Sequence, residues 1–378
     1  MGAPVYTPPV RALPQFVSRA LEERGRELTV LIVRLGAMGD ILRTLPAVLL
    51  LRRAAPRAQL VWVCEEKWRA VLDRHPDLDE IVGMPRKDWQ ELARSVADWP
   101  RLLRSIAAFR RRLRLLGAQL VIDFHGNLRS GLTGWISGAP VRLGYDGHQQ
   151  REGNRMFSTH RVNSGDRRTP RMERNLDLIR YLNISDAPLP DSLRLPMLDS
   201  GQEAASKIRG ELPGGGSRFV ILSPGASAAQ AYKKPPGELL AAAARHLSQR
   251  GCTPLVVHGP GELEDARRVT EASAGAAILA PPTDLATLAA LMSQARLFAG
   301  GDSGPLHLAC AVGCPVVGIY GPTDPQVNQP WGVPWRAVYP AGRRYTGIKR
   351  VDRTRGFEGL EPEHVLASID DLLGRGLG

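Results

Sequence analysis

The chain has 378 residues, of which 43% are hydrophobic and 23% are charged. This composition excludes an intrinsically disordered protein, and the length suits two domains of about 150–200 residues each. No apolar run reaches the roughly 20 residues of a membrane-spanning helix, and the first residues lack the apolar core of a signal peptide, so we expect a cytoplasmic protein.

The formal net charge of +12 restricts the classes of partner. Nucleic acid is not expected, because aromatic residues do not alternate with the arginines and no helix-turn-helix or zinc-finger pattern occurs. A phosphorylated substrate, or contact with an anionic membrane surface, explains the charge better. The densest basic cluster lies in an amphipathic helical pattern and consists of Arg110, Arg111, Arg112 and Arg114. Because arginine is scattered along the whole chain, the alternative that the charge has no function stays open.

The first half of the chain alternates between strand and helix patterns. An apolar β-branched run at 28–35 ends in a glycine turn, a helical pattern follows at 41–55, and a second strand is expected at 59–64. This order is a βαβ unit and predicts a parallel sheet. Further strands are expected at 80–84, 120–124 and 141–144, with a helix near 102–116.

The same design restarts after a segment rich in Pro, Asp, Ser and Gly at about 185–216, which predicts a linker with one short helix at 202–211. Strands are then expected at 219–223, 253–258, 277–279, 297–300 and 315–320, and helices at 236–249, 262–273, 284–294, 304–312 and 361–374. The fold class is therefore α/β, with two doubly wound units. Ligands of such sheets bind beyond the carboxyl ends of the strands, so the loops that follow strands are the places to inspect.

The first such loop is Gly36-Ala37-Met38-Gly39-Asp40. Its glycines permit close backbone approach, and Asp40 stands at the start of a helix, where the anionic carboxylate is stabilised. Asp40 could simply cap this helix, or it could act as a general base, and the two roles are compatible. The spacing is not the G-x-G-x-x-G of a dinucleotide site.

The second loop begins at Gly225 and reaches Lys233 and Lys234 just before two prolines that open a helix. A helix start with a lysine beside it suits a phosphate group, although two solvated lysines are the alternative.

The third loop runs from Gly300 through Asp302, Ser303, Gly304 and Pro305 to His307. Its free amides at a helix start suit a diphosphate, and Asp302 could accept hydrogen bonds from sugar hydroxyls. Helix capping with a buried core histidine is the alternative.

No metal site is expected. Cys310 and Cys314 lack a second pair of ligands, and four cysteines in all fit a reducing compartment. The D-x-D motif Asp77-Leu78-Asp79 lies far along the chain from the glycine turns, and we interpret it as structural.

These motifs resemble glycosyltransferase family nine, the heptosyltransferases of lipopolysaccharide inner-core assembly. The resemblance rests on 33–40 (VRLGAMGD), on His125-Gly126 with Arg129-Ser130, on Gly144-Tyr145-Asp146 with Arg151-Glu152, and above all on 301–309 (GDSGPLHLA) followed by 321–325 (GPTDP). The sequence departs from the family at Pro235, where an aromatic residue is common, at Gln150, where a small residue is usual, and at Arg43, where some members have His.

The resemblance implies a GT-B fold, in which two Rossmann-like domains face a central cleft. The segments it implies are an N-terminal extension (1–27), an acceptor domain (28–190), a linker (191–216), a nucleotide-sugar domain (217–350) and a C-terminal helix (351–378) that packs back on the N-terminal domain. The implied substrates are an ADP-activated heptose and a lipid-anchored saccharide acceptor, with no cofactor.

The resemblance also implies roles for individual residues. Asp40, next to Gly39, would be the general base, and Lys233 or its neighbour Lys234 would contact the donor phosphate. Glu262 would hold the nucleoside ribose. The remaining donor residues would be Asp302, Ser303, Gly304, Pro305 and His307, and the acceptor residues Arg129 and Arg151.

A mechanism follows as a hypothesis. One base and no enzyme nucleophile give a single displacement, which inverts the anomeric centre without a metal ion. Alternatives are the use of another nucleotide-sugar, a sugar-nucleotide epimerase or hydrolase of the same architecture, and a non-catalytic nucleotide-binding module. A dehydrogenase is not expected, because its cofactor fingerprint is missing.

Overall fold

The computed structural model describes residues 12–184, 195, 199–343, 345 and 356–374, which form two compact units, residues 1–190 and 191–378. Parts of the predicted N-terminal extension, linker and C-terminal segment lie outside the described residues. No helix in the described ranges combines the length and the apolar character needed to cross a bilayer.

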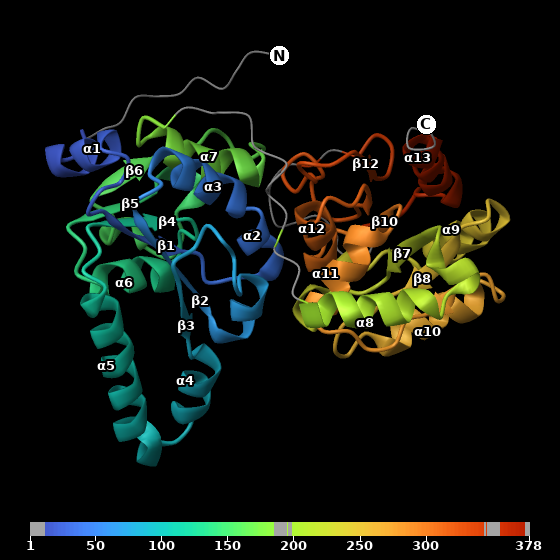
Figure 1. The fold of residues 1–378 in the computed structure, drawn as a ribbon, viewed down its shortest axis with the longest axis horizontal. Helices are drawn as coiled ribbons and strands as arrows, with labels where there is room; N and C mark the ends of the chain where they lie inside the picture. Colours follow the sequence, from blue (N-terminus) through green and yellow to red (C-terminus); the bar gives the residue numbers. More distant parts are fainter. Residues whose placement is uncertain (1–11, 185–194, 196–198, 344, 346–355, 375–378) are drawn as a thin grey trace. The chain divides into compact units, whose positions relative to one another are not determined.

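Unit 1 is built on a six-stranded sheet in which every pairing is parallel and the order is β3-β2-β1-β4-β5-β6 (Figure 1). Its strands are β1 (Thr29–Val33), β2 (Gln59–Glu65), β3 (Glu80–Met84), β4 (Leu120–Asp123), β5 (Val141–Tyr145) and β6 (His160–Val162). The central strands are buried almost throughout, as their continuous apolar sequence requires in a sheet that is covered on both faces.

The helices of unit 1 cover both faces of this sheet. They are α1 (Gln15–Glu22), α2 (Met38–Leu42), α3 (Leu45–Ala54), α4 (Arg86–Leu92), α5 (Trp99–Leu115), α6 (Leu128–Ile136) and α7 (Arg171–Arg180). Leu31, Val33 and Val121 point to the face that is closed by Phe109 and Leu113 of α5. The single helix expected at 41–55 is two helices, because Pro46 occupies the first turn of α3 and cannot continue the hydrogen bonding of α2.

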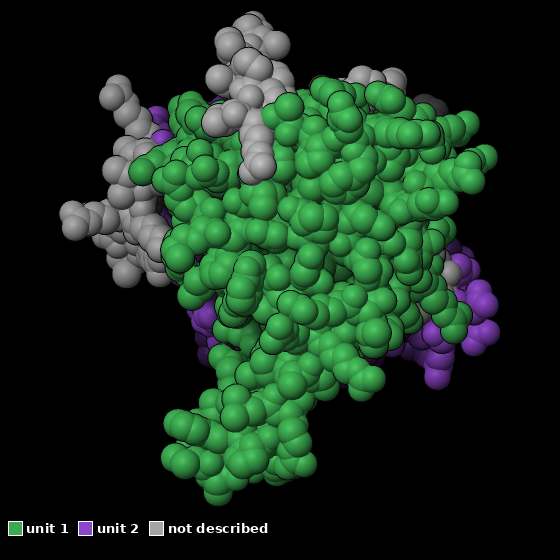
Figure 2. All heavy atoms as spheres, turned by 90° about the vertical axis from the view of Figure 1, so that its left-hand side faces the viewer, with its two compact units in different colours: residues 1–190 green, residues 191–378 purple. Residues whose placement is uncertain are grey.

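Helices α4 and α5, joined through a 3-10 turn at Val96–Asp98, extend from unit 1 as an arm, which we define as residues 86–116 (Figures 1 and 2). Phe109 and Leu113 are the buried residues of α5, and α4 has none. At the base of the arm, the ring of Trp89 meets that of Phe109 edge-on, 5.4 Å between centroids. Most of the arm surface is therefore exposed.

Unit 2 repeats the design with a second parallel sheet, ordered β12-β11-β10-β7-β8-β9. Its strands are β7 (Phe219–Ser223), β8 (Thr253–Val256), β9 (Ile278–Leu279), β10 (Phe298–Gly301), β11 (Val316–Ile319) and β12 (Trp335–Val338). Its helices are α8 (Asp199–Gly210), α9 (Gly237–Gln249), α10 (Leu263–Ala272), α11 (Leu285–Gln294), α12 (Gly304–Ala311) and α13 (Pro362–Gly374). Numbered within its own unit, each sheet has the strand order 3-2-1-4-5-6, which is that of a Rossmann fold.

Two helices of unit 2 lie outside the range predicted for its nucleotide-sugar domain (217–350). Helix α8 corresponds to the helix expected at 202–211 within the predicted linker, and it packs on α11. Helix α13 joins the core of unit 2 beside α9 and β12. The reason is its apolar stripe: Val365, Ile369 and Leu372 recur every three to four residues and are buried in that core.

Candidate active site

In each unit, loops that carry predicted site residues follow the first and fourth strands, where the strand order reverses. These are the loops after β1 and β4 in unit 1, and after β7 and β10 in unit 2. Ligands of doubly wound sheets bind at this reversal point. Each unit therefore offers one candidate site.

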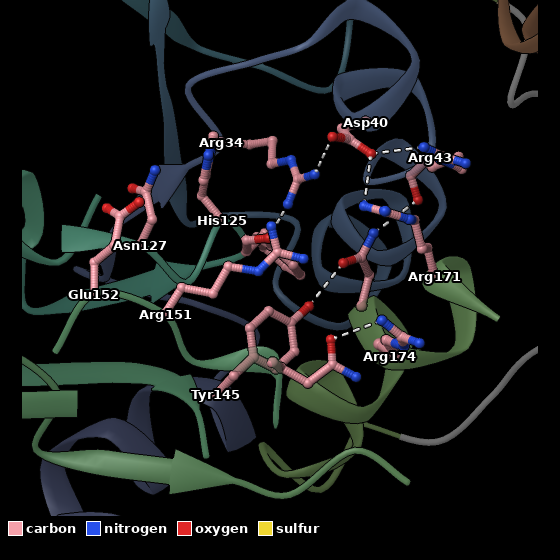
Figure 3. Close-up of a pocket in the computed structure, with 13 residues that line it drawn as sticks. Arg34, Asp40, Arg43, His125, Asn127, Tyr145, Arg151, Glu152, Arg171 and Arg174 are labelled. Carbon is pink, nitrogen blue, oxygen red and sulfur yellow. Dashed lines mark hydrogen bonds and ion pairs between the residues drawn. The ribbon is translucent and has the colours of Figure 1, made fainter. Parts of the chain in front are cut away.

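A pocket rich in arginine opens beyond the strand ends of unit 1 (Figure 3). It is lined by Arg34, Asp40, Arg43, Phe124, His125, Asn127, Tyr145, Gln149, Arg151, Glu152, Arg171, Arg174 and Asn175. Five arginines thus face two acidic residues. Such an excess of guanidinium groups favours an anionic ligand, because their planar donor pairs match carboxylate and phosphate oxygens.

Asp40 is held by three of these arginines. Its Oδ2 lies 2.8 Å from Nη2 of Arg34, and its Oδ1 lies 2.6 Å from Nη2 of Arg43 and 3.5 Å from Nη1 of Arg171. Asp40 is in the first turn of α2, but that helix has no side-chain cap, so capping does not describe the role of its carboxylate. Figure 3 shows the carboxylate turned toward these guanidinium groups.

The arginines determine the charge of Asp40. Burial alone would raise the pKa of its carboxyl, but the charges of Arg34, Arg171 and Arg43 outweigh burial and hold the pKa well below its ordinary value. Asp40 is therefore an anion at any physiological pH. The Asp40 carboxylate can take up a proton only when its contacts with the arginines weaken.

A buried hydrogen-bond network holds the helix of Asp40 against α7. The Tyr145 hydroxyl donates to Oδ1 of Asn175 at 2.7 Å, and the Asn175 amide donates to the Arg43 carbonyl at 3.0 Å. The hydroxyl of Thr44 in turn donates to the carbonyl of Asp40 at 2.8 Å. These bonds fix the Asp40 backbone, so the position of the carboxylate does not depend on the arginines alone.

The loop after β4 is shaped by a buried acid, Asp123, which accepts hydrogen bonds from the amides of His125 and Gly126 and from the side chains of Ser130 and Asn154. Burial raises the pKa of Asp123 against the effect of these bonds. The loop places His125 in the pocket. Burial lowers the pKa of His125 to about 3, and the charges of Arg34, Arg129 and Arg151 act in the same direction, while Asp40 opposes them.

His125 gives a testable pH dependence. Its folded pKa of about 3 lies below the ordinary value of 6.5, so below pH 6.5 the unfolded chain binds a proton that the folded chain does not. The free energy of unfolding should therefore fall, by up to about 1.4 kcal/mol per pH unit, as the pH drops from 6.5 toward the folded pKa. We expect a shallower loss in His125→Gln, measured by urea unfolding across this range. The exposed His364→Gln should retain the wild-type slope, and an unchanged slope in His125→Gln would contradict the assignment.

The two predicted acceptor arginines lie in different surroundings. Arg151 lines the pocket. Arg129 instead reaches Glu65, with 3.3 Å between Nη1 and Oε1, and Arg86 contacts the same carboxylate oxygen at 2.6 Å. The structure therefore brings Arg151, and not Arg129, into the lining of the Asp40 pocket.

Both aspartates of the D-x-D motif contact Arg52 of unit 1. Asp79 Oδ2 lies 2.6 Å from Arg52 Nη2 and accepts a hydrogen bond from the Leu60 amide at 2.7 Å. The guanidinium of Arg52 also donates to the carbonyl of Asp77. These contacts join α3 to the β2–β3 connection. Among the described residues, no group of three or more His, Cys, Asp or Glu side chains is arranged to hold a metal ion.

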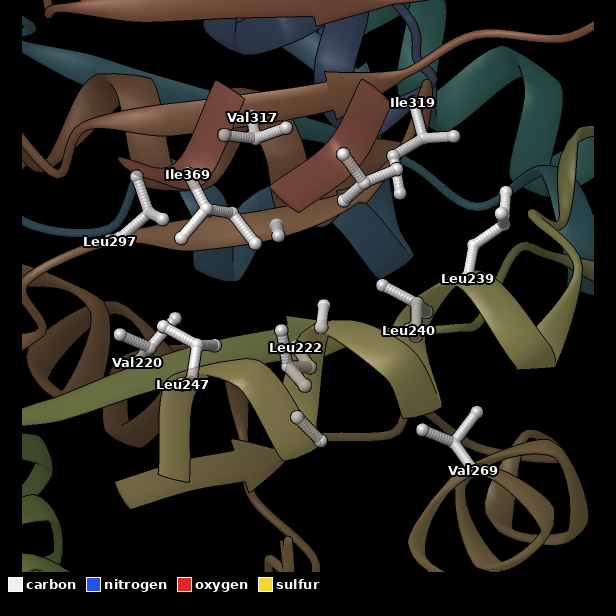
Figure 4. Close-up of a cluster of buried hydrophobic side chains, with 14 of the residues drawn as sticks. Val220, Leu222, Leu239, Leu240, Leu247, Val269, Leu297, Val317, Ile319 and Ile369 are labelled. Atoms are coloured by element: carbon white, nitrogen blue, oxygen red, sulfur yellow. The ribbon is translucent and has the colours of Figure 1, made fainter. Parts of the chain in front are cut away.

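In unit 2, the loops after β7 and β10 meet through Lys233 and Asp302, whose Nζ and Oδ2 are 3.2 Å apart. Nε2 of His307, in the first turn of α12, lies 3.6 Å from the other oxygen of Asp302. Asp302 and His307 are almost fully buried. The strands that carry these loops are held by an apolar cluster against α9 and α13 (Figure 4).

Glycine allows this close approach of the two loops. A Cβ atom on Gly301 would lie 2.7 Å from the Lys233 carbonyl oxygen, and one on Gly300 would lie 2.7 Å from the Ser223 carbonyl oxygen. Ser303 occupies the N-cap position of α12, but its hydroxyl makes no capping bond. That hydroxyl is buried and has no hydrogen-bond partner among the described residues. Pro305 occupies the first turn of α12, and the Ser303 hydroxyl lies beside the start of this helix, where a ligand anion is favoured.

Gly301→Ala should therefore disturb this candidate site. The added methyl group would push the Lys233 backbone away, so we expect a loss of about 1–3 kcal/mol in the free energy of unfolding and weaker binding of the nucleotide that the sequence predicts for this loop. Calorimetry with ADP and urea unfolding measure the two effects. Gly210→Ala, where no atom lies within 4 Å of the new methyl group, is the matched control and should bind ADP as the wild type does. Equal behaviour of both variants would contradict this account of the loop.

The two other predicted donor residues of unit 2 lie nearby but have different partners. Lys234 forms an ion pair with Asp265 of α10 and not with Asp302. Glu262 accepts a hydrogen bond from the Gly259 amide at 2.9 Å. A Cβ atom on Gly225 would lie 2.0 Å from Oε2 of Glu262, so this glycine lets the carboxylate lie against the loop after β7.

Sequence reasoning missed part of the unit 1 pocket. Arg171, Arg174 and Asn175 were not singled out, although their i, i+3, i+4 spacing places them on one face of α7. This spacing was the available signal. What it could not show is that this face meets Asp40, which lies 131 residues earlier in the chain.

Comparisons with known proteins agree with this architecture. Residues 106–353 match glycosyltransferase family 9 (heptosyltransferase). Lipopolysaccharide heptosyltransferase 1 of Pseudomonas aeruginosa is 29% identical over 310 residues, which cover 81% of this chain and 82% of that protein. Lipopolysaccharide heptosyltransferase 3 of Escherichia coli K12 is 25% identical over 350 residues, which cover 89% and 95% of the two chains.

Solved structures share the fold. A glycosyl transferase family 9 protein from Veillonella parvula has a TM-score of 0.76 at 22% identity, covering 92% of this chain and 98% of its own. The Escherichia coli heptosyltransferase WaaC with ADP has a TM-score of 0.69 at 21% identity, covering 91% and 100%. The expected GT-B fold is thereby confirmed. Since the family match spans well over half of the sequence, the chain belongs to glycosyltransferase family 9, the heptosyltransferase family, and is a glycosyltransferase.

Proposed function

We propose that this glycosyltransferase moves heptose from ADP-heptose to a lipid-anchored saccharide of the lipopolysaccharide inner core, with inversion and without a metal ion. The observation that carries the proposal is Asp40, a carboxylate that is ionised at physiological pH and lies in an arginine-lined pocket of a family 9 enzyme. Relatives named as lipopolysaccharide heptosyltransferases, and a structural neighbour that binds ADP, support the substrate class.

Unit 2 supplies the donor half of the proposed reaction. Lys233 and the first-turn amides of α12, with Ser303 and Gly304, bind the diphosphate, and Asp302 and His307 bind sugar hydroxyls. Glu262 accepts hydrogen bonds from the ribose. As the bond from the anomeric carbon to the diphosphate breaks, negative charge grows on ADP, and these donors stabilise it.

Unit 1 supplies the acceptor half. Asp40 accepts the proton of the acceptor hydroxyl while that oxygen attacks the anomeric carbon. Because Arg34, Arg43 and Arg171 hold the carboxylate in its ionised form, it becomes an effective base only when their contacts are loosened. An acceptor that carries an anionic group would loosen these contacts, because that group competes with Asp40 for the guanidinium groups of the pocket, including Arg151.

A panel of ADP-, GDP- and UDP-sugars tests the donor assignment. The full chain should be stabilised against thermal unfolding by ADP-heptose more than by the other nucleotide-sugars, and product analysis should show heptose on the acceptor. Transfer should persist in the presence of a chelator. Preference for a GDP- or UDP-sugar would contradict the assignment of ADP-heptose as the donor. Conversion of the donor when no acceptor is present would favour the epimerase or hydrolase alternative.

A further inference from the structure

The arm of unit 1 carries an apolar stripe that no part of unit 1 covers. Trp99, Leu103 and Ile106 of α5 are 51%, 63% and 38% exposed, and Val96 in the preceding turn is 73% exposed. The spacing i, i+4, i+7 puts the first three on one helix face, adjacent to the face that Phe109 and Leu113 bury. An isolated exposed leucine requires no explanation, but a stripe at the end of a projecting arm does.

The stripe continues into basic residues. Arg110 and Arg114 follow on the same helix face, and a shallow groove along it is lined by Leu103, Ile106, Ala107, Arg110, Arg111, Arg114 and Leu115. Between residues 86 and 116 the sequence has nine Lys or Arg and three Asp or Glu. Half of the net charge of the protein is thus concentrated in the arm, which is less than a tenth of the chain.

We infer that the arm docks on an anionic phospholipid bilayer. Exposed Val96, Trp99 and Leu103 near the tip enter the boundary between headgroups and acyl chains, and the arginines of α5 contact the lipid phosphates. An amphipathic helix with Trp and Leu on one side and arginines beside them is the pattern of interfacial membrane helices. This inference goes beyond the proposed function, because it concerns where the enzyme acts and does not depend on which sugar it transfers.

Charge and shape disfavour the other occupants of this surface. A second copy of the chain would bring the same basic arm, and like charges repel. Nucleic acid would use the arginines but would not cover the apolar side chains at the tip. An anionic bilayer satisfies both parts of the surface at once.

Flotation of the full chain with vesicles tests the inference. We expect partitioning onto vesicles of phosphatidylcholine mixed with phosphatidylglycerol, little partitioning onto phosphatidylcholine alone, and weakening by salt. Because one arginine near an anionic surface strengthens binding by roughly fivefold, the triple variant Arg110→Gln/Arg111→Gln/Arg114→Gln should bind on the order of 100-fold more weakly. The double variant Trp99→Ser/Leu103→Ser should lose much of the binding that persists at high salt.

Matched controls come from exposed positions of unit 2. The triple variant Arg218→Gln/Arg267→Gln/Arg268→Gln removes the same charge, and Leu263→Ser removes an apolar side chain that is 37% exposed. Both should partition as the wild type does, and thermal unfolding of every variant checks the fold. Vesicle binding is measured without donor or acceptor, so its outcome is separate from that of the proposed reaction.

Three results would overturn the inference: equal binding of arm and control variants, self-association in solution that the arm variants abolish, or tighter binding of an oligonucleotide than of the anionic vesicles.

Discussion

Replacing Asp40 by asparagine should lower turnover on the order of 100- to 10,000-fold, which is what one positioned general base contributes. Asparagine keeps the size of the side chain and an oxygen for the arginines, but it cannot take a proton from the acceptor. The affinity for ADP should stay unchanged, because the donor residues proposed here belong to unit 2. Steady-state kinetics with a saturating donor, together with calorimetry of ADP binding, separate the two effects.

The matched control is Glu23→Gln, which removes an acid from an exposed ion pair with Arg19 on α1. It should transfer sugar as the wild type does.

The arginines provide a second test of Asp40. Removing a positive charge in Arg171→Gln should raise the pKa of Asp40 and move the acidic limb of the pH–rate profile to higher pH. A fully active Asp40→Asn enzyme would exclude Asp40 as the base.

Lys233→Ala should have the second largest effect. The Lys233 ammonium, 3.2 Å from Asp302, is proposed to stabilise the departing diphosphate. Loss of one such stabilising donor costs roughly 100- to 1000-fold in turnover in measured cases. We also expect a weaker affinity for ADP, because the phosphate contact exists before the reaction as well.

Lys234→Ala is the sharpest control for Lys233, because it removes the same side chain one position along the chain. Lys234 pairs with Asp265 at a partly exposed site, where an ion pair contributes little to stability, so activity and ADP affinity should change only slightly. A Lys234→Ala variant that is more damaged than Lys233→Ala would reverse the assignment of the two lysines. Thermal unfolding of both variants excludes loss of the fold as the cause.

Much of the fold could be predicted from the sequence, because buried parallel strands are continuous apolar runs that glycine turns terminate. The runs at β1 and β7 were located within one or two residues of their observed ends. Short edge strands gave no such signal: β6 has three residues and includes a histidine and an arginine, and β12 includes an arginine. Helix α7 was also missed, because its sequence is mostly polar.

The candidate sites could be located but not assembled from the sequence. The motifs around Asp40 and Asp302 were visible because glycine and acidic residues follow strands there. Which of the two lysines approaches Asp302 depends on the 3-10 turn at Ala228–Lys233, whose geometry no spacing rule gives. The ring of arginines around Asp40 likewise combines neighbours in the sequence with Arg171 from α7, so it required the folded unit.

The two separate apolar cores have a consequence for how such enzymes diversify. Each sheet is complete, with its own helices on both faces, and each carries its own polar loops at the same point of the strand order. The arginine pocket is thus built entirely on the first core, and the residues around Lys233 are built entirely on the second. Descendants of one ancestral enzyme could in this way acquire new acceptors while they inherit an unaltered donor site.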